Sequence, residues 1–378
     1  MRSVFICNEM LGLGHLGVSL AIAAELVATP EDSALVITGS PAYKSMRVPQ
    51  GVELLKVPTA VPGVDSAWSK TGLRPPGEHA LAPEEVSALR AEAYRDAIER
   101  INPDALIVDY RPLGRDRDLV PALEVADASG SCQIALGIWD CDDSPDGIRA
   151  QWAPELIERA ADFYDVAFVY GPPAPDDIRV NALGAAGIPI EVVDFVSGPP
   201  AVAPAPDLPA GYLLASTGGG ADGFATLDAV LAAIRLRPIP THTVLVTGPL
   251  MPQDDVVRLR LSAEGVDATI FESRADLPEL LFGARAVVSM AGYSTTAEIL
   301  ASGKPALMIP RAVPREEQLN RAKRLAESGR VSLLEPKNLN AETMRDALSG
   351  LLEQKPRTPE RLCGVSDVRR FLHANLDK

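Results

Sequence analysis

The residues best suited to chemistry in this sequence are glycines that separate apolar runs from helical stretches. One loop, LGLGHLG, follows the first apolar run and contains Gly12, Gly14 and His15. A second loop, STGGGADG, contains Gly218, Gly219 and Gly220. Glycine exposes backbone N–H groups at a helix N-terminus, where the helix dipole favours anions. We therefore predict an anion or carbohydrate-hydroxyl site at the first loop and a phosphate cradle at the second.

The two loops differ from the common nucleotide-binding motifs. The first satisfies the dinucleotide pattern G-x-G-x-x-G through Gly17, but the second predicted strand ends without the acidic residue that holds a ribose in such proteins. The second lacks the Lys-Ser/Thr pair of a P-loop, so nucleotide hydrolysis is not indicated. His15 is open to two interpretations, because it can cap the helix or act as an acid or base.

The segment SMAGYSTTAEI has the most specific pattern. It leads from an apolar run into a hydroxyl-rich helix start, and its candidate residues are Gly292, Tyr293, Ser294, Thr295, Thr296 and Glu298. Backbone N–H groups at such a start can hold a diphosphate, and a carboxylate one turn further on can accept two hydroxyl protons from a ribose. The alternative is that Glu298 only complements the helix dipole.

Two further segments are rich in charge. PRAVPREEQLNRA places cations, two acids and the amide of Gln318 around a helix start, which alone is typical of a solvated N-terminus. DCDDSPD, from Asp140 to Asp146, offers oxygen ligands for a divalent cation. Its spacing matches no calcium loop and Pro145 places it in a turn, so we predict no metal site. Trp139 and Trp152, which flank this segment, fit either an acceptor surface or the core.

The elements that must position these residues alternate between strand and helix, which is typical of parallel βαβ units. Strands are expected at 3–7, 35–38, 52–57, 105–109, 133–137, 166–170, 212–216, 243–247, 268–271, 286–290 and 306–309. Helices are expected at 16–27, 83–100, 224–236, 254–264, 277–283, 295–302, 316–328 and 365–376. The proline run at 198–211 can form neither helix nor central strand and is interpreted as a semi-rigid linker. The fold class is therefore α/β, with two Rossmann-like, doubly wound parallel-sheet domains at 1–197 and 212–355, facing across a cleft.

Composition bounds the function. A length of 378 residues predicts two domains, and a net charge of −15 without a basic run argues against nucleic acid and anionic membrane surfaces as partners. The four cysteines show no paired spacing, so neither a disulfide framework nor a zinc site is indicated, and a cytoplasmic location is expected. The first apolar run, 4–7, is too short for a signal peptide or an integral membrane segment.

Four motifs in this order, GLGH, STGGGADG, SMAGYSTTAEILASGKPALMIP and PREEQLNRA, resemble the nucleotide-sugar glycosyltransferases of the GT-B fold. The sequence is most similar to glycosyltransferase family 28, which contains the N-acetylglucosaminyltransferase that completes the peptidoglycan lipid precursor. A branch of bacterial glycosyltransferases with the GLGH and PREEQ signatures is also similar. The resemblance spans most of the chain, and it implies that the C-terminal segment 356–378 packs back on the first domain.

The resemblance also implies roles for individual residues. The loop 218–220 and the turn 292–296 would face the donor diphosphate, and Glu298 would hold the ribose hydroxyls. The stretch 270–274, with Phe271 and Arg274, would lie at the nucleobase. Glu317 and Gln318 would reach the donor sugar. His15 would lie under the transferred sugar, with Gly12 and Gly14 in the acceptor loop. Relatives often carry a basic residue shortly after GLGH, whereas this chain continues with Leu16, Gly17 and Val18.

The mechanism implied by the resemblance is direct displacement at the anomeric carbon with inversion and without a metal cofactor. We expect His15 as the base, with Asp109 or Asp140 as its orienter or alternative. Asp109 ends a predicted strand, where it either points into the cleft or pairs with Arg111 on the surface.

The expected partners are a nucleoside-diphosphate sugar and a small-molecule or lipid-linked acceptor, and a homodimer is left open. A nucleotide-sugar epimerase is the second hypothesis, disfavoured because the second-domain loops contain no further histidine that could serve as an acid or base. A non-catalytic nucleotide-sugar-binding protein is the third.

Overall fold

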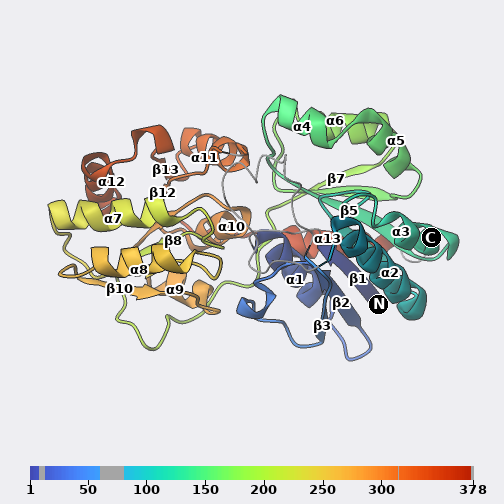
Figure 1. The fold of residues 1–378 in the computed structure, drawn as a ribbon, viewed down its shortest axis with the longest axis horizontal. Coiled ribbons are helices and arrows are strands. Elements are labelled where there is room, and N and C mark those ends of the chain that lie inside the picture. The colour runs from blue at the N-terminus through green and yellow to red at the C-terminus, as the bar shows by residue number, and fades with distance from the viewer. Residues whose placement is uncertain (8–12, 60–80, 314, 376–378) are drawn as a thin grey trace. The chain divides into compact units, whose positions relative to one another are not determined.

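The computed structural model describes residues 1–7, 13–59, 81–313 and 315–375. The chain divides into two compact units, which are described one at a time (Figure 1). Unit 1 comprises Met1–Gly198 and Leu362–Lys378, and unit 2 comprises Pro199–Arg361. In the described part of the chain, no helix is both long and apolar enough to cross a membrane.

Unit 1 contains a seven-stranded parallel sheet with the order β3-β2-β1-β4-β5-β6-β7. Its strands are β1 (Arg2–Cys7), β2 (Ser33–Thr38), β3 (Val52–Lys56), β4 (Ala105–Asp109), β5 (Gln133–Trp139), β6 (Val166–Tyr170) and β7 (Ile190–Val193). Every residue of β4 and β6 is buried, because helices cover both faces of a parallel sheet. The strand order reverses between β1 and β4, and the carboxyl ends of such strands form the usual ligand position in this architecture.

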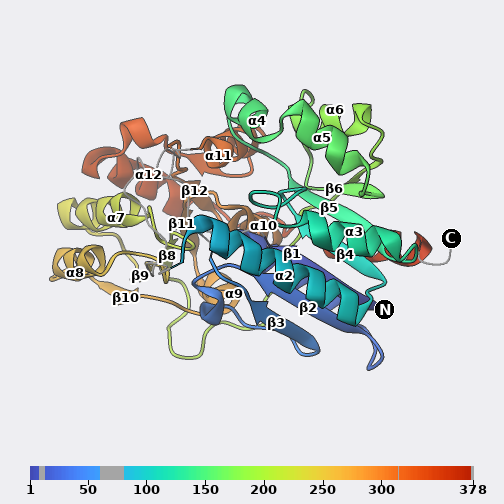
Figure 2. The same cartoon turned by 45° about the vertical axis from the view of Figure 1, so that its right-hand side comes forward.

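The helices of unit 1 lie on both faces of this sheet. They are α1 (Gly14–Leu26), α2 (Pro83–Ile101), α3 (Val120–Ala128), α4 (Pro145–Gln151), α5 (Pro154–Ala161), α6 (Ile178–Ala185) and α13 (Gly364–Asn375). Helices α2 and α3 pack on each other in front of the strands in Figure 2, and α1 packs on α13. The α2 start at Pro83 is as predicted: proline suits a first helical position, and Glu84 and Glu85 lie in the first turn.

Unit 2 contains a six-stranded parallel sheet with the order β10-β9-β8-β11-β12-β13. Its strands are β8 (Leu213–Ser216), β9 (Thr243–Val246), β10 (Ala268–Phe271), β11 (Ala286–Ser289), β12 (Ala306–Met308) and β13 (Ser332–Leu333). Its helices are α7 (Phe224–Leu236), α8 (Gln253–Ser262), α9 (Leu277–Gly283), α10 (Tyr293–Ser302), α11 (Glu317–Glu327) and α12 (Ala341–Glu353). The order reverses between β8 and β11, so the predicted fold class of two doubly wound parallel sheets is confirmed.

The proline run belongs to unit 2 by its contacts. Ala205 is buried, the Asp207 carboxylate pairs with Arg274, and the Gly211 N–H donates to the Gly283 carbonyl at 2.8 Å. The segment is therefore anchored to unit 2 at Ala205, Asp207 and Gly211, although most of its residues are exposed.

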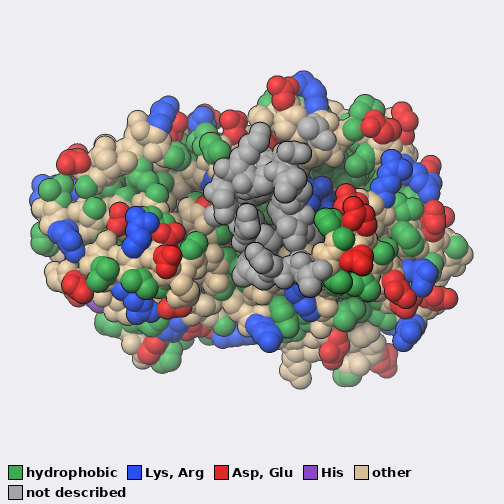
Figure 3. All heavy atoms as spheres, viewed as in Figure 1, with side chains coloured by type: hydrophobic (Ala, Val, Ile, Leu, Met, Phe, Trp, Pro, Cys, Tyr) green, Lys and Arg blue, Asp and Glu red, His purple; other side chains and the backbone are tan. Residues whose placement is uncertain are grey.

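Charged side chains of both signs are interspersed over the described part of the face in Figure 3. That face shows no extended basic stripe of the kind that contacts to a nucleic-acid backbone require.

Candidate functional site

The first cluster of interest lies at the reversal point of the unit 1 sheet. Helix α1 begins at Gly14, and His15 is its second residue. Asp109 ends β4, which pairs directly with β1. The His15 Nδ1 lies 2.5 Å from Asp109 Oδ2, and the carboxylate is only 3% exposed. A carboxylate accepts the proton of Nδ1, so Nε2 carries the ring lone pair, as a general base requires.

This geometry separates the alternatives left by the sequence. Asp109 is buried, which rules out the alternative of a surface pair with Arg111. Asp140 is buried after β5, and Asp109 is the carboxylate that accepts the hydrogen bond from His15 Nδ1. Of the predicted acceptor-loop glycines, Gly14 begins α1, whereas Gly12 lies outside the described residues.

Two aromatic rings fix the plane of the His15 imidazole. Trp139 stacks on it with a centroid distance of 4.1 Å, and Tyr110 meets it edge-on at 5.7 Å. Tyr110 has a φ of 69°, a left-handed conformation that is rare for a bulky residue and persists only where the surroundings impose it. Trp152 packs in the hydrophobic core, and its ring meets the Tyr110 ring edge-on at 5.8 Å.

A buried arginine anchors both rings. The Arg179 guanidinium donates to the Trp139 carbonyl at 2.8 Å and pairs with Asp177 at 2.6 Å and Asp142 at 3.4 Å. The Tyr110 hydroxyl donates to the same Asp142 at 2.7 Å. Arg179 is completely buried, and its pKa stays raised because the two carboxylates outweigh desolvation. No motif singles out Arg179 in the sequence, because its partners lie up to 40 residues away.

The acid-rich segment is therefore engaged in protein contacts. Asp142 belongs to the Arg179 network, and Asp146 pairs with Arg149 at 2.9 Å. No group of three or more His, Cys, Asp or Glu side chains arranged to hold a metal ion occurs in the described ranges.

The second cluster lies at the reversal point of the unit 2 sheet, where the glycine loop follows β8. Gly218 and Gly220 have φ values of 64° and 89°. A Cβ on Gly220 would lie 2.0 Å from the Thr247 carbonyl oxygen, so only glycine fits there. The Thr217 hydroxyl donates to the same carbonyl at 2.8 Å, which fixes the loop against the chain after β9.

Helix α10 begins directly after the neighbouring strand β11. Its cap residue is Gly292, which has no side chain. The first backbone hydrogen bond of the helix runs from the Thr296 N–H to the Gly292 carbonyl at 2.9 Å. The N–H groups before Thr296 thus have no acceptor within the helix. Ala291, with a φ of 61°, is held by Arg321, which donates to its carbonyl at 3.1 Å. Two buried hydroxyls, of Ser216 and Thr296, have no hydrogen-bond partner among the described residues.

Glu298 lies in the second turn of α10, which begins at Tyr293. The dipole alternative is thereby weakened, because charge effects of the helix end fall off within the first turn. No hydrogen bond or ion pair to the Glu298 carboxylate occurs within the described ranges. The side chain keeps partial solvent access, and burial of the carboxylate raises its pKa to about 7. A carboxylate held without a partner has room for hydroxyl donors.

A third group connects the loop after β12 to the start of α11. Arg311 pairs with Glu317 and, at 3.1 Å, with Asp222 of the glycine-rich loop. The Gln318 Oε1 accepts the Arg311 backbone N–H at 3.0 Å. The structure thus brings the predicted residues Glu317 and Gln318 together with the glycine-rich loop, and adds Arg311, whose role the sequence did not single out.

The predicted nucleobase segment is held rigidly. Arg274 lies over the Phe271 ring at 4.7 Å and forms two hydrogen bonds each with Asp276 and Asp207. These hydrogen bonds lower the pKa of both carboxyls. With its guanidinium engaged in this way, Arg274 fixes the loop after β10.

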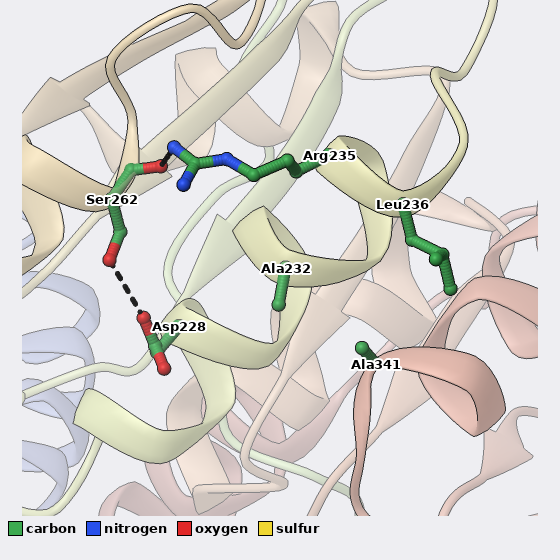
Figure 4. A pocket seen from close by; sticks show the side chains of 6 residues that line it. All are labelled: Asp228, Ala232, Arg235, Leu236, Ser262 and Ala341. Atoms are coloured by element: carbon green, nitrogen blue, oxygen red, sulfur yellow. Dashed lines mark hydrogen bonds between the residues drawn. The ribbon is translucent and has the colours of Figure 1, made fainter.

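A pocket of about 300 Å³ lies elsewhere in unit 2 (Figure 4). It is lined by Asp228, Ala232, Arg235, Leu236, Ser262 and Ala341. Arg235 donates to the Ser262 carbonyl at 2.6 Å, and the Ser262 hydroxyl donates to Asp228 at 3.0 Å. The pocket follows α7 to its C-terminal end, whereas the glycine loop precedes the N-terminal end of α7. We therefore do not include it in the candidate site.

Comparison with known proteins supports the resemblance. Residues 217–363 match the glycosyltransferase family 28 C-terminal domain. The UDP-N-acetylglucosamine–N-acetylmuramyl-(pentapeptide) pyrophosphoryl-undecaprenol N-acetylglucosamine transferase of Rhodospirillum rubrum is 32% identical over 154 residues. The alignment covers 40% of this chain and 39% of that protein, so the chain matches about two fifths of this curated relative.

Solved structures show the same fold over nearly the whole chain. The glycotransferase of kitacinnamycin matches with a TM-score of 0.60 and 18% identity, over 99% of this chain and 94% of that one. A UDP-GlcNAc 2-epimerase from Methanocaldococcus jannaschii matches with a TM-score of 0.59 and 13% identity, over 99% and 100% of the two chains. At these identities the likeness concerns the fold, which is of the GT-B type.

Proposed function

We propose that this chain transfers a sugar from a nucleoside diphosphate to an acceptor. The match of residues 217–363 to the glycosyltransferase family 28 C-terminal domain supports this proposal. The observation that carries the proposal is an α10 start that follows β11 with a glycine as its cap residue and has Glu298 one turn further on. The N–H groups at that start suit a diphosphate, and the carboxylate suits the two hydroxyls of a ribose. The acceptor is a small molecule or a lipid-linked one.

In the proposed reaction, His15 accepts the proton of an acceptor hydroxyl through Nε2. The acceptor oxygen forms a bond to the anomeric carbon while the bond from that carbon to the diphosphate oxygen breaks, which inverts the configuration. Asp109 holds the imidazole in the required tautomer and stabilises the imidazolium that forms. The leaving diphosphate gathers negative charge, which helix N-termini and hydroxyl donors stabilise, and we propose that this replaces a metal ion.

Thermal-shift screening tests the donor site. Uridine, thymidine, guanosine and cytidine diphosphates are each added to the protein, and one of them is expected to raise the melting temperature in a concentration-dependent manner. At a hundred times its dissociation constant, a ligand that binds only the folded state stabilises it by about 2.7 kcal/mol. If all four leave the melting temperature unchanged, the donor assignment fails.

The epimerase is the second candidate, since an epimerase shares the fold at full coverage. Incubation with the matching nucleotide sugar and no acceptor distinguishes the two. A transferase leaves the sugar configuration unchanged, as followed by proton NMR of the anomeric region. Formation of an epimer would replace the transferase proposal.

Substituting Glu298 by alanine is expected to weaken nucleotide-sugar binding by about 1.5–3 kcal/mol, the value of a hydrogen bond to a charged group. Because the carboxyl has a pKa of about 7, it is mostly protonated at pH 6 and mostly ionised at pH 8. Ribose hydroxyls donate to the ionised form, so affinity should rise between these pH values and stay flat in Glu298→Gln. Calorimetry with the nucleotide sugar measures both effects.

The nucleotide sugar is the right probe for this titration because the terminal phosphate of a free diphosphate itself titrates near pH 6. Glu353→Ala, at the exposed end of α12, is the matched control and should bind as the wild type does. Equal affinities of Glu298→Ala and the wild type would remove Glu298 from the donor site.

A further inference from the structure

Arg311 joins three parts of unit 2 to which the donor is assigned. One terminal nitrogen pairs with Asp222 of the glycine-rich loop, and the other with Glu317 at the start of α11. Its backbone N–H donates to the Gln318 side chain. The Arg311 side chain is only 14% exposed, so these contacts are largely shielded from water. Arg311 thus fixes the positions of the glycine-rich loop and of both predicted sugar-binding side chains relative to one another.

The contacts argue against a direct phosphate role for Arg311. Each terminal nitrogen of the guanidinium faces a carboxylate, and two carboxylates around one cation leave a net negative charge. A diphosphate would have to displace one of these pairs. Partly buried ion pairs of this kind fix the positions of their own side chains, and they contribute little to the attraction of a further anion.

The same contacts set the hydrogen-bonding polarity of the two side chains. Gln318 Oε1 accepts a backbone N–H, so its amide nitrogen is the end that remains to donate. Glu317 gives one oxygen to Arg311, while its Oε2 is buried and has no hydrogen-bond partner among the described residues. The pair therefore offers one acceptor and one donor on consecutive residues at the start of α11, a combination that suits two hydroxyls of a sugar.

We propose that Arg311 is a positioning residue that pre-sets Glu317 and Gln318 for the hydroxyls of the donor sugar. This inference rests on the proposed function, since it assumes that the sugar of a nucleotide donor lies at this pair. If Arg311 has this role, its loss should impair recognition of the sugar and spare recognition of the nucleoside diphosphate. Loss of an ion pair with a purely structural role would not separate these two affinities.

The test compares two affinities in the same variant. The probes are the nucleoside diphosphate that stabilises the wild type and the same nucleotide carrying glucose or N-acetylglucosamine. In Arg311→Met, calorimetry should show about a tenfold loss of affinity for the nucleotide sugar, the loss of roughly one well-placed hydrogen bond. Affinity for the diphosphate alone should change by less than about threefold. Asp222→Asn removes the ion pair between Asp222 and Arg311. This variant should also lose more affinity for the nucleotide sugar than for the diphosphate.

The matched control is Arg330→Met, which removes a partly exposed ion pair with Glu360 elsewhere in unit 2 and should bind both probes as the wild type does. An equal loss of both affinities in Arg311→Met would make Arg311 a diphosphate ligand and overturn the inference. Unchanged affinities would overturn it as well. A wild type that binds none of the diphosphates would remove the proposed function, and this inference with it.

Discussion

Replacing His15 with alanine is expected to lower turnover by about 10²–10⁴-fold, the usual contribution of a positioned general base. Affinity for the nucleotide sugar should stay within about twofold, because the proposed donor residues all belong to unit 2, whereas a base acts on the acceptor proton. The measurement is nucleoside-diphosphate release with an acceptor on which the wild type acts. Asp109→Asn should lower turnover as well, because an amide can stabilise the wrong imidazole tautomer.

His242 provides a matched control for this experiment. It also pairs with an aspartate, Asp267, at 2.7 Å, and Thr269 lies 3.0 Å from its second ring nitrogen. It directly precedes β9, so it lies at the amino-terminal edge of the unit 2 sheet, opposite the glycine loop. His242→Ala should retain full turnover. If His15→Ala also retains full turnover, the base must be reassigned.

Substituting Arg179 by methionine is expected to lower the free energy of unfolding by about 3–5 kcal/mol. The side chains of Asp142 and Asp177 are at most 5% exposed, and the substitution would leave both carboxylates buried without their cation. The loss should be measurable in urea denaturation as a lower midpoint with an unchanged slope. Arg149→Met is the control, because its pair with Asp146 is 64% and 97% exposed and such pairs contribute about 0–1 kcal/mol.

A loss below about 1 kcal/mol would show that Arg179 is not the centre of this network. The variant also informs on the site. Arg179 holds the Trp139 carbonyl and, through Asp142, the Tyr110 hydroxyl. Fluorescence of the tryptophans under native conditions should therefore change in Arg179→Met and not in Arg149→Met.

The alternation of apolar and helical stretches predicted the architecture because parallel strands are buried on both faces. The strands Ala105–Asp109 and Val166–Tyr170 are buried at every position and were predicted with the observed bounds. β7 (Ile190–Val193) was missed, since it is an edge strand and only one of its residues is buried. α4, α5 and α6 were also missed, because helices of seven or eight residues span too few turns to show a period.

The candidate site was predictable where a motif follows a strand along the chain. His15 and Glu298 lie on the helices that follow β1 and β11 in the chain, where the βαβ pattern expects them. Arg179 was not predictable, because two of its partners, Trp139 and Asp142, lie on an earlier segment, up to 40 residues away, that only the folded chain brings beside it. The sequence pattern includes Arg311 only as one of several cations near a helix start. Its pairing with Asp222 and Glu317 cannot be read from sequence spacing.

The return of α13 to unit 1 makes this unit depend on a segment that follows unit 2 in the chain. Gly364 lies so close to the backbone after β7 that a Cβ there would come within 2.3 Å of the Asp194 carbonyl oxygen. Val368 and Leu372 are fully buried, and Arg369 reaches Glu25 of α1. Because α13 follows unit 2 in the chain, all of unit 2 is synthesised before unit 1 receives this covering helix. Until α13 has been synthesised, the face of α1 that packs on it stays uncovered.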